Sequence, residues 1–154
     1  MKSNSILSLV CIVLGMLITA CSGGTFLHEY HDTDLWGWNN DDTISFDLPI
    51  ITSSGEVEAE VGVRFTNTYA YQDLILLGTL ECNETPVQTD TIKVSIFKKN
   101  GANEGEGFPY ITTIQPAATF QVDSGQVYHY YLTHLMSPAP IKGIAGIGLR
   151  LKSK

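Results

Sequence analysis

The strongest constraint on the fold is a stretch of the chain in which apolar and polar side chains alternate. The apolar positions are Val57, Ala59, Val61, Val63 and Phe65, and between and after them stand Glu58, Glu60, Gly62, Arg64 and Thr66. Successive side chains of a strand point to opposite faces, so this run predicts a strand with one buried face and one wet face. No stretch after the amino-terminal apolar segment has the 3.6-residue period of a helix.

Shorter runs with strand character lie on both sides of this one. They are expected at 26–31, 43–48, 74–80, 91–96, 110–115, 119–122, 127–136 and 145–151. The run 74–80 is almost continuously apolar, so we expect a central strand covered on both sides. Turn segments such as Asn100-Gly101 separate the runs. The pattern predicts an all-β fold, an antiparallel β-sandwich of the jelly-roll or the immunoglobulin-like type.

The amino terminus has the pattern of a bacterial lipoprotein signal. Lys2 precedes an apolar run over 6–20, and Ile18-Thr19-Ala20-Cys21 resembles a lipobox, in which the cysteine is lipidated and becomes the first residue. As a helix the run is roughly 22 Å long, short of the ~30 Å hydrocarbon core of a membrane. We therefore expect a signal peptide over 1–20, lipid attachment at Cys21, a tether over 21–25 and one β-sandwich domain over 26–154. The alternative is an uncleaved anchor or an ordinary signal.

A lipid at Cys21 would attach the chain to a membrane. One acyl chain anchors a protein only marginally, whereas the two or three chains of a lipoprotein hold it stably. Residues 22–25 reach at most about 14 Å when extended, so the folded domain would lie close to the bilayer.

Charge and cysteine content argue against a nucleic-acid partner and against an intrachain disulfide bond. The net charge is −7 with Lys2 included, and it becomes −8 when 1–20 are removed, because Lys2 is the charged side chain in that segment. Nucleic acid is an unsuitable partner for so acidic a chain without a basic patch. Cys11 leaves with the signal and Cys21 takes the lipid, so Cys82 has no cysteine to pair with. We expect Cys82 to be a half-buried structural residue.

None of the candidate metal-binding or catalytic motifs in the sequence is complete. The segment His28-Glu29-Tyr30-His31-Asp32 lacks the second histidine of a zinc-protease motif, and on a strand His28 and His31 face opposite ways. The acids between Asp32 and Asp42 are interrupted by apolar residues, unlike a calcium loop. No Gly-x-Ser-x-Gly elbow is present. We therefore expect no catalytic residue, no metal and no cofactor, with an envelope hydrolase as a rival interpretation.

The unusual feature is aromatic. Trp36-Gly37-Trp38 would place two indoles on one side of an extended backbone, and Tyr30 lies shortly before them. Such side chains can stack on sugars or anchor a protein partner. The interpretation that we favour is that they close the end of the sandwich core.

Several motifs together resemble the gliding-motility lipoprotein GldH family of the Bacteroidota. They are Tyr30, Trp36-Gly37-Trp38, Phe46, the segment 63–67 followed by Tyr71, Asp90-Thr91, Gly105-Glu106-Gly107, His134-Leu135-Met136 and the segment 141–148. The resemblance covers nearly the whole chain. It implies a non-enzymatic envelope lipoprotein linked to gliding motility and its secretion apparatus, with envelope proteins as partners. Bacteroidota lipoproteins that are sent to the outside carry an acidic run after the lipidated cysteine, and none follows Cys21. The resemblance therefore favours a domain anchored in the outer membrane and facing the periplasm. The rival is a glycan-binding lipoprotein with Trp36, Trp38 and Tyr30 as its platform.

Overall fold

The structure is a computed structural model, and it describes residues 24–154. The predicted signal peptide and the lipid site Cys21 lie outside the described residues. Within the described part the regular elements are strands, and no helix long and apolar enough to cross a membrane is found there. The eight strands of residues 24–154 are β1 (Thr25–Asp32), β2 (Ile44–Asp47), β3 (Gly55–Phe65), β4 (Asp73–Cys82), β5 (Thr85–Ser95), β6 (Ile111–Val122), β7 (Tyr128–His134) and β8 (Ile144–Ser153).

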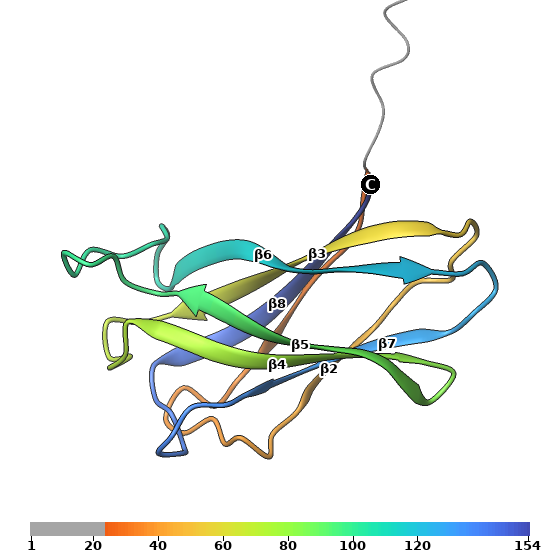
Figure 1. The fold of residues 1–154 in the computed structure, drawn as a ribbon. Coiled ribbons are helices and arrows are strands. Elements are labelled where there is room, and N and C mark those ends of the chain that lie inside the picture. Colours follow the sequence, from red (N-terminus) through yellow and green to blue (C-terminus); the bar gives the residue numbers. More distant parts are fainter. Residues whose placement is uncertain (1–23) are drawn as a thin grey trace, which may run out of the picture.

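The strands form two antiparallel sheets that pack face to face (Figure 1). One sheet has the order β1-β8-β3-β6 and the other has the order β2-β7-β4-β5. The chain changes sheet at every connection except β4 to β5, which is a hairpin. Of the two predicted topologies, this strand order is that of the jelly roll. The predicted all-β antiparallel sandwich is confirmed.

The core lies between the sheets and follows the alternation seen in the sequence. On β3 the residues Val57, Val61 and Phe65 are buried at 3% exposure or less, while Glu58 and Arg64 face outwards. β8 brings Leu149 opposite Val61, so two apolar side chains meet on the inner face. The opposite sheet supplies the inward side chains of β4 and β7. Burial of one face of each sheet is what holds the two layers together.

Four strands differ from their prediction. β4 is central in its sheet, but only its alternate residues are fully buried, so it is not covered on both sides. β5 begins at Thr85, because a tight turn with positive φ at Asn83 (49°) and Glu84 (65°) starts it earlier than its apolar residues suggest. The runs 110–115 and 119–122 are one strand, β6, with a register irregularity near Pro116. Thr25 belongs to β1, so the sheet begins within the predicted tether.

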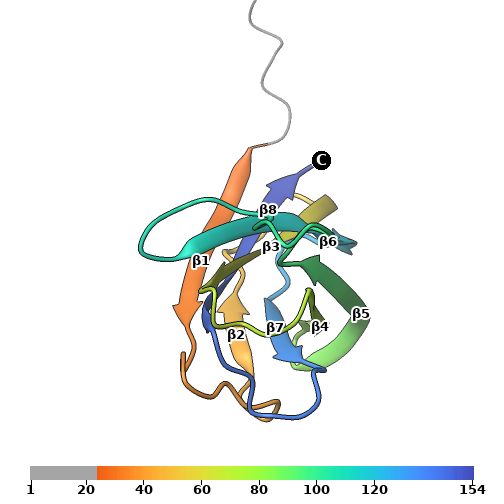
Figure 2. The same cartoon turned by 90° about the vertical axis from the view of Figure 1, so that its left-hand side faces the viewer.

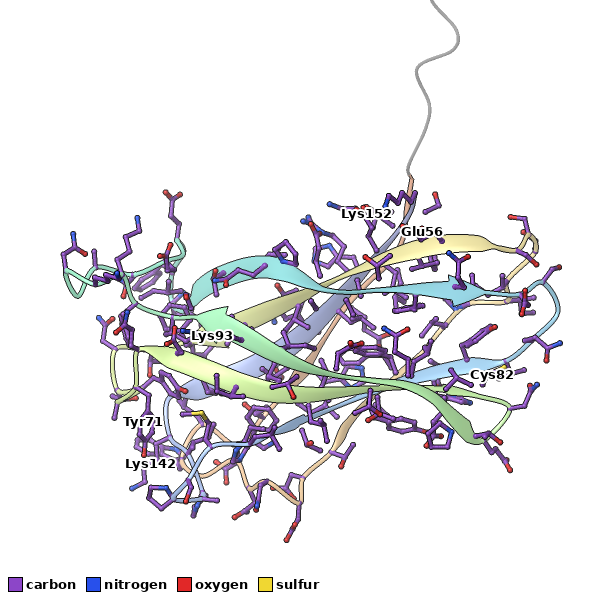
Figure 3. All side chains as sticks on the ribbon, in the orientation of Figure 1. Glu56, Tyr71, Cys82, Lys93, Lys142 and Lys152 are labelled. Carbon is purple, nitrogen blue, oxygen red and sulfur yellow. The ribbon has the colours of Figure 1, made fainter. Side chains whose placement is uncertain are left out.

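The antiparallel order collects the loops at two ends of the sandwich. The near end, where the described chain starts, holds Gly24, Lys154 and the loops 48–54, 83–84 and 123–127. The far end holds the loops 33–43, 66–72, 96–110 and 135–143, and Figure 2 looks onto it. Figure 3 shows Glu56 and Lys152 beside the chain start and Tyr71 and Lys142 on the opposite side. We use "near end" and "far end" in this sense below.

Candidate functional site

The far end is built on a direct link between two loops that are distant in sequence. Trp38 and Ile141 exchange two backbone hydrogen bonds, each 2.9 Å long, and so form a short antiparallel bridge. The amide of Gly143 also donates to the carbonyl of Leu35 at 3.0 Å. These bonds hold loops 33–43 and 135–143 together as one unit.

The side chain of Trp38 lies beneath this bridge, with 1% of its surface exposed. Its indole Nε1 donates to the carbonyl of Asp42 at 2.9 Å, which satisfies the buried polar atom. The ring packs edge-on against the imidazole of His134, with 4.8 Å between ring centroids. Trp38 is therefore a core residue that closes the far end of the sandwich.

His134 is the polar centre of this cluster. Its Nδ1 accepts a hydrogen bond from the amide of Met136 at 3.2 Å, so Nε2 carries the proton and donates to the carbonyl of Trp38 at 3.1 Å. Burial lowers the pKa of His134, although the Trp38 carbonyl and the charge of Asp42 act in the other direction. The imidazole is thus held neutral, and both of its nitrogen atoms are used to fix loop positions.

A third loop joins at Gly143. This residue has φ +88°, and a Cβ there would overlap the backbone N and Cα of Tyr69. The amide of Thr66 donates to the carbonyl of Gly143 at 2.8 Å, and the Tyr69 hydroxyl donates to the carbonyl of Asp73 at 2.9 Å. Only a glycine lets the loops 66–72 and 135–143 approach so closely.

Trp36 is presented on the outside of this framework, with 77% of its surface exposed. The amide of Gly37 donates to the carbonyl of Asp34 at 3.1 Å, and the amide of Trp36 donates to Oδ1 of Asp34 at 2.9 Å. The backbone is therefore turned rather than extended at this point. This corrects the expectation that both indoles lie on one side: Trp38 is in the core, and the two rings do not form a common platform for a sugar.

Other apolar side chains are exposed on far-end loops. Phe108 is 96% exposed, Leu135 50% and Tyr110 40%. The position of Leu135 is fixed, because its amide donates to the carbonyl of Ile75 at 2.8 Å. We call Trp36, Phe108, Tyr110 and Leu135 the far-end apolar side chains. Large exposed apolar side chains that lie together on one end of a domain are candidates for contact with another molecule.

An acidic hollow adjoins the loop that carries Trp36. It has a volume of about 260 Å³, and Asp32, Asp34 and Asp42 line it together with Trp38. Asp34 and Asp42 are already used to hold the loop, since they accept hydrogen bonds from the amides of Trp36 and Asn39. Within residues 24–154 no group of three His, Cys, Asp or Glu side chains is arranged to hold a metal ion.

Tyr30 lies elsewhere, on the outer face of β1. Its ring crosses Gly148 and Gly62, where a Cβ would overlap it, and the Arg64 guanidinium carbon lies 4.0 Å from the ring centroid on this surface. The hydroxyl is buried and has no hydrogen-bond partner in the described part of the chain. Burial raises the pKa of Tyr30, and the charge of Arg64 opposes this. The ring therefore lies between the glycines of the sheet and the Arg64 side chain, and it covers this part of the sheet.

Sequence reasoning did not single out several residues of this site. His134 entered only as part of the motif His134-Leu135-Met136, and Phe108 was not singled out. For His134 a signal existed, because its place among inward-facing residues of β7 predicts a buried imidazole that needs partners. Cys82 lies half-buried at the end of β4, as expected, and is a free thiol.

The backbone has distant counterparts among solved structures. A family 35 carbohydrate-binding module from Clostridium thermocellum is 11% identical, with a TM-score of 0.40, and the match covers 85% of this chain and 98% of that one. Dimeric latent PorU from Porphyromonas gingivalis is 12% identical over 82% of this chain and 12% of its own, with a TM-score of 0.35.

Two findings in sequence confirm the resemblance noted above. The chain is 23% identical over 163 residues to the gliding motility lipoprotein GldH of Flavobacterium johnsoniae, and the match covers 99% of this chain and 98% of that protein. The model of the GldH lipoprotein family matches residues 25–151, from the first strand to the last. The chain therefore belongs to the GldH lipoprotein family.

Proposed function

We propose that this chain is a non-catalytic, lipid-anchored protein of the cell envelope that serves a gliding-motility machinery, and its secretion apparatus, by binding a protein partner. Membership of the GldH family and the name of the Flavobacterium relative support the process. The lipobox pattern before Cys21 supports the anchor. We place the lipid in the outer membrane and the domain in the periplasm.

The observation that carries the binding role is the exposure of Trp36 on a fixed loop. Tryptophan is among the residues that contribute most to protein interfaces, because a large ring can be desolvated at small cost in conformational entropy. Here 77% of the side chain is exposed, while the bridge between Trp38 and Ile141 holds its loop in place. A ring that is presented in this way needs little reorganisation on binding.

The direction of β1 supports a membrane anchor at the near end and a partner-binding surface at the far end. The strand leads from the chain start to the far end, and eight residues of antiparallel strand span about 27 Å. A lipid at Cys21 would therefore hold the near end at the membrane, and Trp36 would stand at the other side of the domain. The far-end apolar side chains would then be accessible to an envelope protein.

The non-catalytic role is supported by the far-end polar side chains, because they form hydrogen bonds to the backbone. Both ring nitrogens of His134 form hydrogen bonds with backbone groups. Asp34 and Asp42 accept hydrogen bonds from backbone amides of their own loop. Such groups fix loop positions, whereas a general base needs a free nitrogen or oxygen within reach of a substrate.

The test is complementation of a gene deletion in the bacterium that encodes the protein. Cells that carry Trp36→Ala should lose movement over surfaces and release of secreted proteins, although the amount of the variant in the membrane fraction equals that of the wild type. The matched control is Val87→Ala, which removes an apolar side chain of 56% exposure from β5, outside the far end, and should restore both. Full movement and secretion with Trp36→Ala would contradict the proposal, and so would their loss with Val87→Ala.

A further inference from the structure

The near end carries an apolar side chain that is even more exposed than Trp36. Ile50, in the loop 48–54, has 87% of its surface exposed. Its loop is fixed on both sides, because Leu48 and Ile51 are buried at 9% and 8% exposure. The amide of Ser124 also donates to Oγ of Ser54 at 2.9 Å, which ties this loop to the loop 123–127. Ile50 is therefore held outwards by the fold.

Phe26 is a second apolar side chain at the near end, and an irregularity in the pairing of β1 with β8 determines its position. Thr25 pairs with Lys152 but Leu27 pairs with Leu151, so Phe26 is the extra residue of a β-bulge. A bulge turns a side chain away from the regular alternation, and Phe26 lines, together with Ile50, an open hollow of about 410 Å³. The same hollow is bordered by the hydroxyl-bearing residues 52–54. Apolar side chains beside hydroxyl groups suit the boundary between lipid headgroups and acyl chains.

The position of the chain start relates this hollow to the predicted lipid. The carbonyl of Gly24 accepts a hydrogen bond from the amide of Ser153 at 3.3 Å, which fixes the point where the chain leaves the sheet. Two residues, Ser22 and Gly23, separate Gly24 from Cys21, and three extended Cα-to-Cα steps span at most about 11 Å. Ser153 and Lys154 themselves border the hollow. A lipid on Cys21 would therefore bring the hollow to the bilayer surface.

We infer that the near end rests on the membrane, with Ile50 and Phe26 inserted into the lipid surface that holds the Cys21 lipid. This inference rests on the proposed lipid anchor and adds an orientation to it. The contact is apolar rather than electrostatic, since Lys154 is paired with Glu56 and Lys152 with Glu60. Binding in this orientation should thus be insensitive to salt, unlike that of a basic patch. Trp36 then points away from the bilayer.

Fluorescence quenching by brominated lipid tests the orientation. The mature lipidated protein is placed in vesicles of phosphatidylcholine, with and without bromine on the acyl chains. One variant carries Ile50→Trp with Trp36→Phe, and a second carries Phe26→Trp with Trp36→Phe. The buried Trp38 gives a constant background. The controls are the wild type, which reports on Trp36, and Phe108→Trp with Trp36→Phe, which places an indole at a position of 96% exposure on a far-end loop.

We expect loss of fluorescence for the indoles at positions 50 and 26, at low and at high salt, and none for those at 36 and 108. Vesicle-bound protein that is not quenched at 50 and 26 would overturn the orientation and leave the lipid anchor intact. Quenching at 108 in place of 50 would also overturn it, because a different face would then meet the lipid. If the mature protein with its native Cys21 does not sediment with vesicles at all, the lipid anchor itself fails and the inference fails with it.

Discussion

The two ends of the sandwich present exposed apolar side chains on loops that are held in different ways. At the far end, the buried side chains of Trp38 and His134 lie under the loops and Gly143 lets them pack together. At the near end, the loops 48–54 and 123–127 are joined by hydrogen bonds of Ser54 and Ser124, which are exposed. Leu48 and Ile51 of the near-end loop 48–54 are also buried. The difference is that the far-end loops are joined to each other over a buried tryptophan and histidine, whereas the near-end loops are joined to each other through exposed serines.

Mutations should therefore differ in their effect on folding according to whether they change the buried framework or an exposed side chain. A mutation in the far-end framework should destabilise the whole domain, because the same residues shape the loops and fill the core. In contrast, the exposed side chains at both ends contribute little to folding. Trp36 and Ile50 can therefore be tested for binding without loss of the fold, whereas Trp38 and His134 cannot.

The largest effect is expected for Trp38→Ala. It removes a ring with 1% exposure, its packing on His134 and the hydrogen bond to Asp42. The free energy of unfolding should fall by about 3–5 kcal/mol, as measured by urea denaturation. Trp38→Phe keeps an aromatic ring and should cost less. A loss below about 1 kcal/mol for Trp38→Ala would show that the far end is not part of the core.

A pair of glycines compares the two ends directly. Gly143 at the far end and Gly125 at the near end both have positive φ, +88° and +78°, but only Gly143 is packed against another backbone. Gly143→Ala should cost about 1–3 kcal/mol from overlap with Tyr69, in addition to backbone strain. Gly125→Ala should cost about 1–2 kcal/mol, from strain alone. Equal unfolding midpoints for the two variants would contradict the difference between the ends.

Acid should weaken the far end through His134. The unfolded chain binds a proton on this imidazole with a pKa near 6.5, and burial lowers the pKa in the folded state. The unfolded state therefore binds more protons between these two values, so this part of the stability is complete above pH 6.5 and is lost as the pH falls through the folded pKa. Urea denaturation from pH 7.5 to 5 should show the loss. In His134→Gln the slope over this range should be smaller, and an unchanged slope would assign the effect to other groups.

The smallest effect on folding is expected for the two exposed side chains. Trp36→Ala and Ile50→Ala should each change the free energy of unfolding by no more than about 0.5 kcal/mol. Their effects on function should separate, since Trp36→Ala removes the proposed partner contact and Ile50→Ala the proposed lipid contact. A large destabilisation by either would mean that the side chain is needed for packing.

Much of the fold could be predicted from local pattern. The alternation over 57–66 predicts β3 and its buried face, and the order of strand-like runs predicts a sandwich. The choice of the jelly roll was beyond reach, because it depends on which strands pair over long distances, such as β3 with β8. The early start of β5 was missed because Asn83-Glu84 is not a typical turn pair, and the residues after it are mostly polar.

The candidate site was predicted in part. Its aromatic character was visible in Trp36-Gly37-Trp38, but the separation of the two rings was not. The turn at Asp34 and the bridge to Ile141 place Trp36 outside and Trp38 inside. That bridge joins residues about a hundred positions apart, so the local spacing of residues cannot predict it.

The central claim is that Trp36 lies at the partner-binding surface of a membrane-anchored domain. The most direct measurement is photo-crosslinking in living cells, with a photoreactive amino acid placed at position 36 or at position 50 and the adducts identified by mass spectrometry. We expect one defined envelope protein linked at position 36 and not at position 50. Adducts with that protein at position 50 alone, or equally at both positions, would contradict this claim, as would the absence of a protein adduct at position 36.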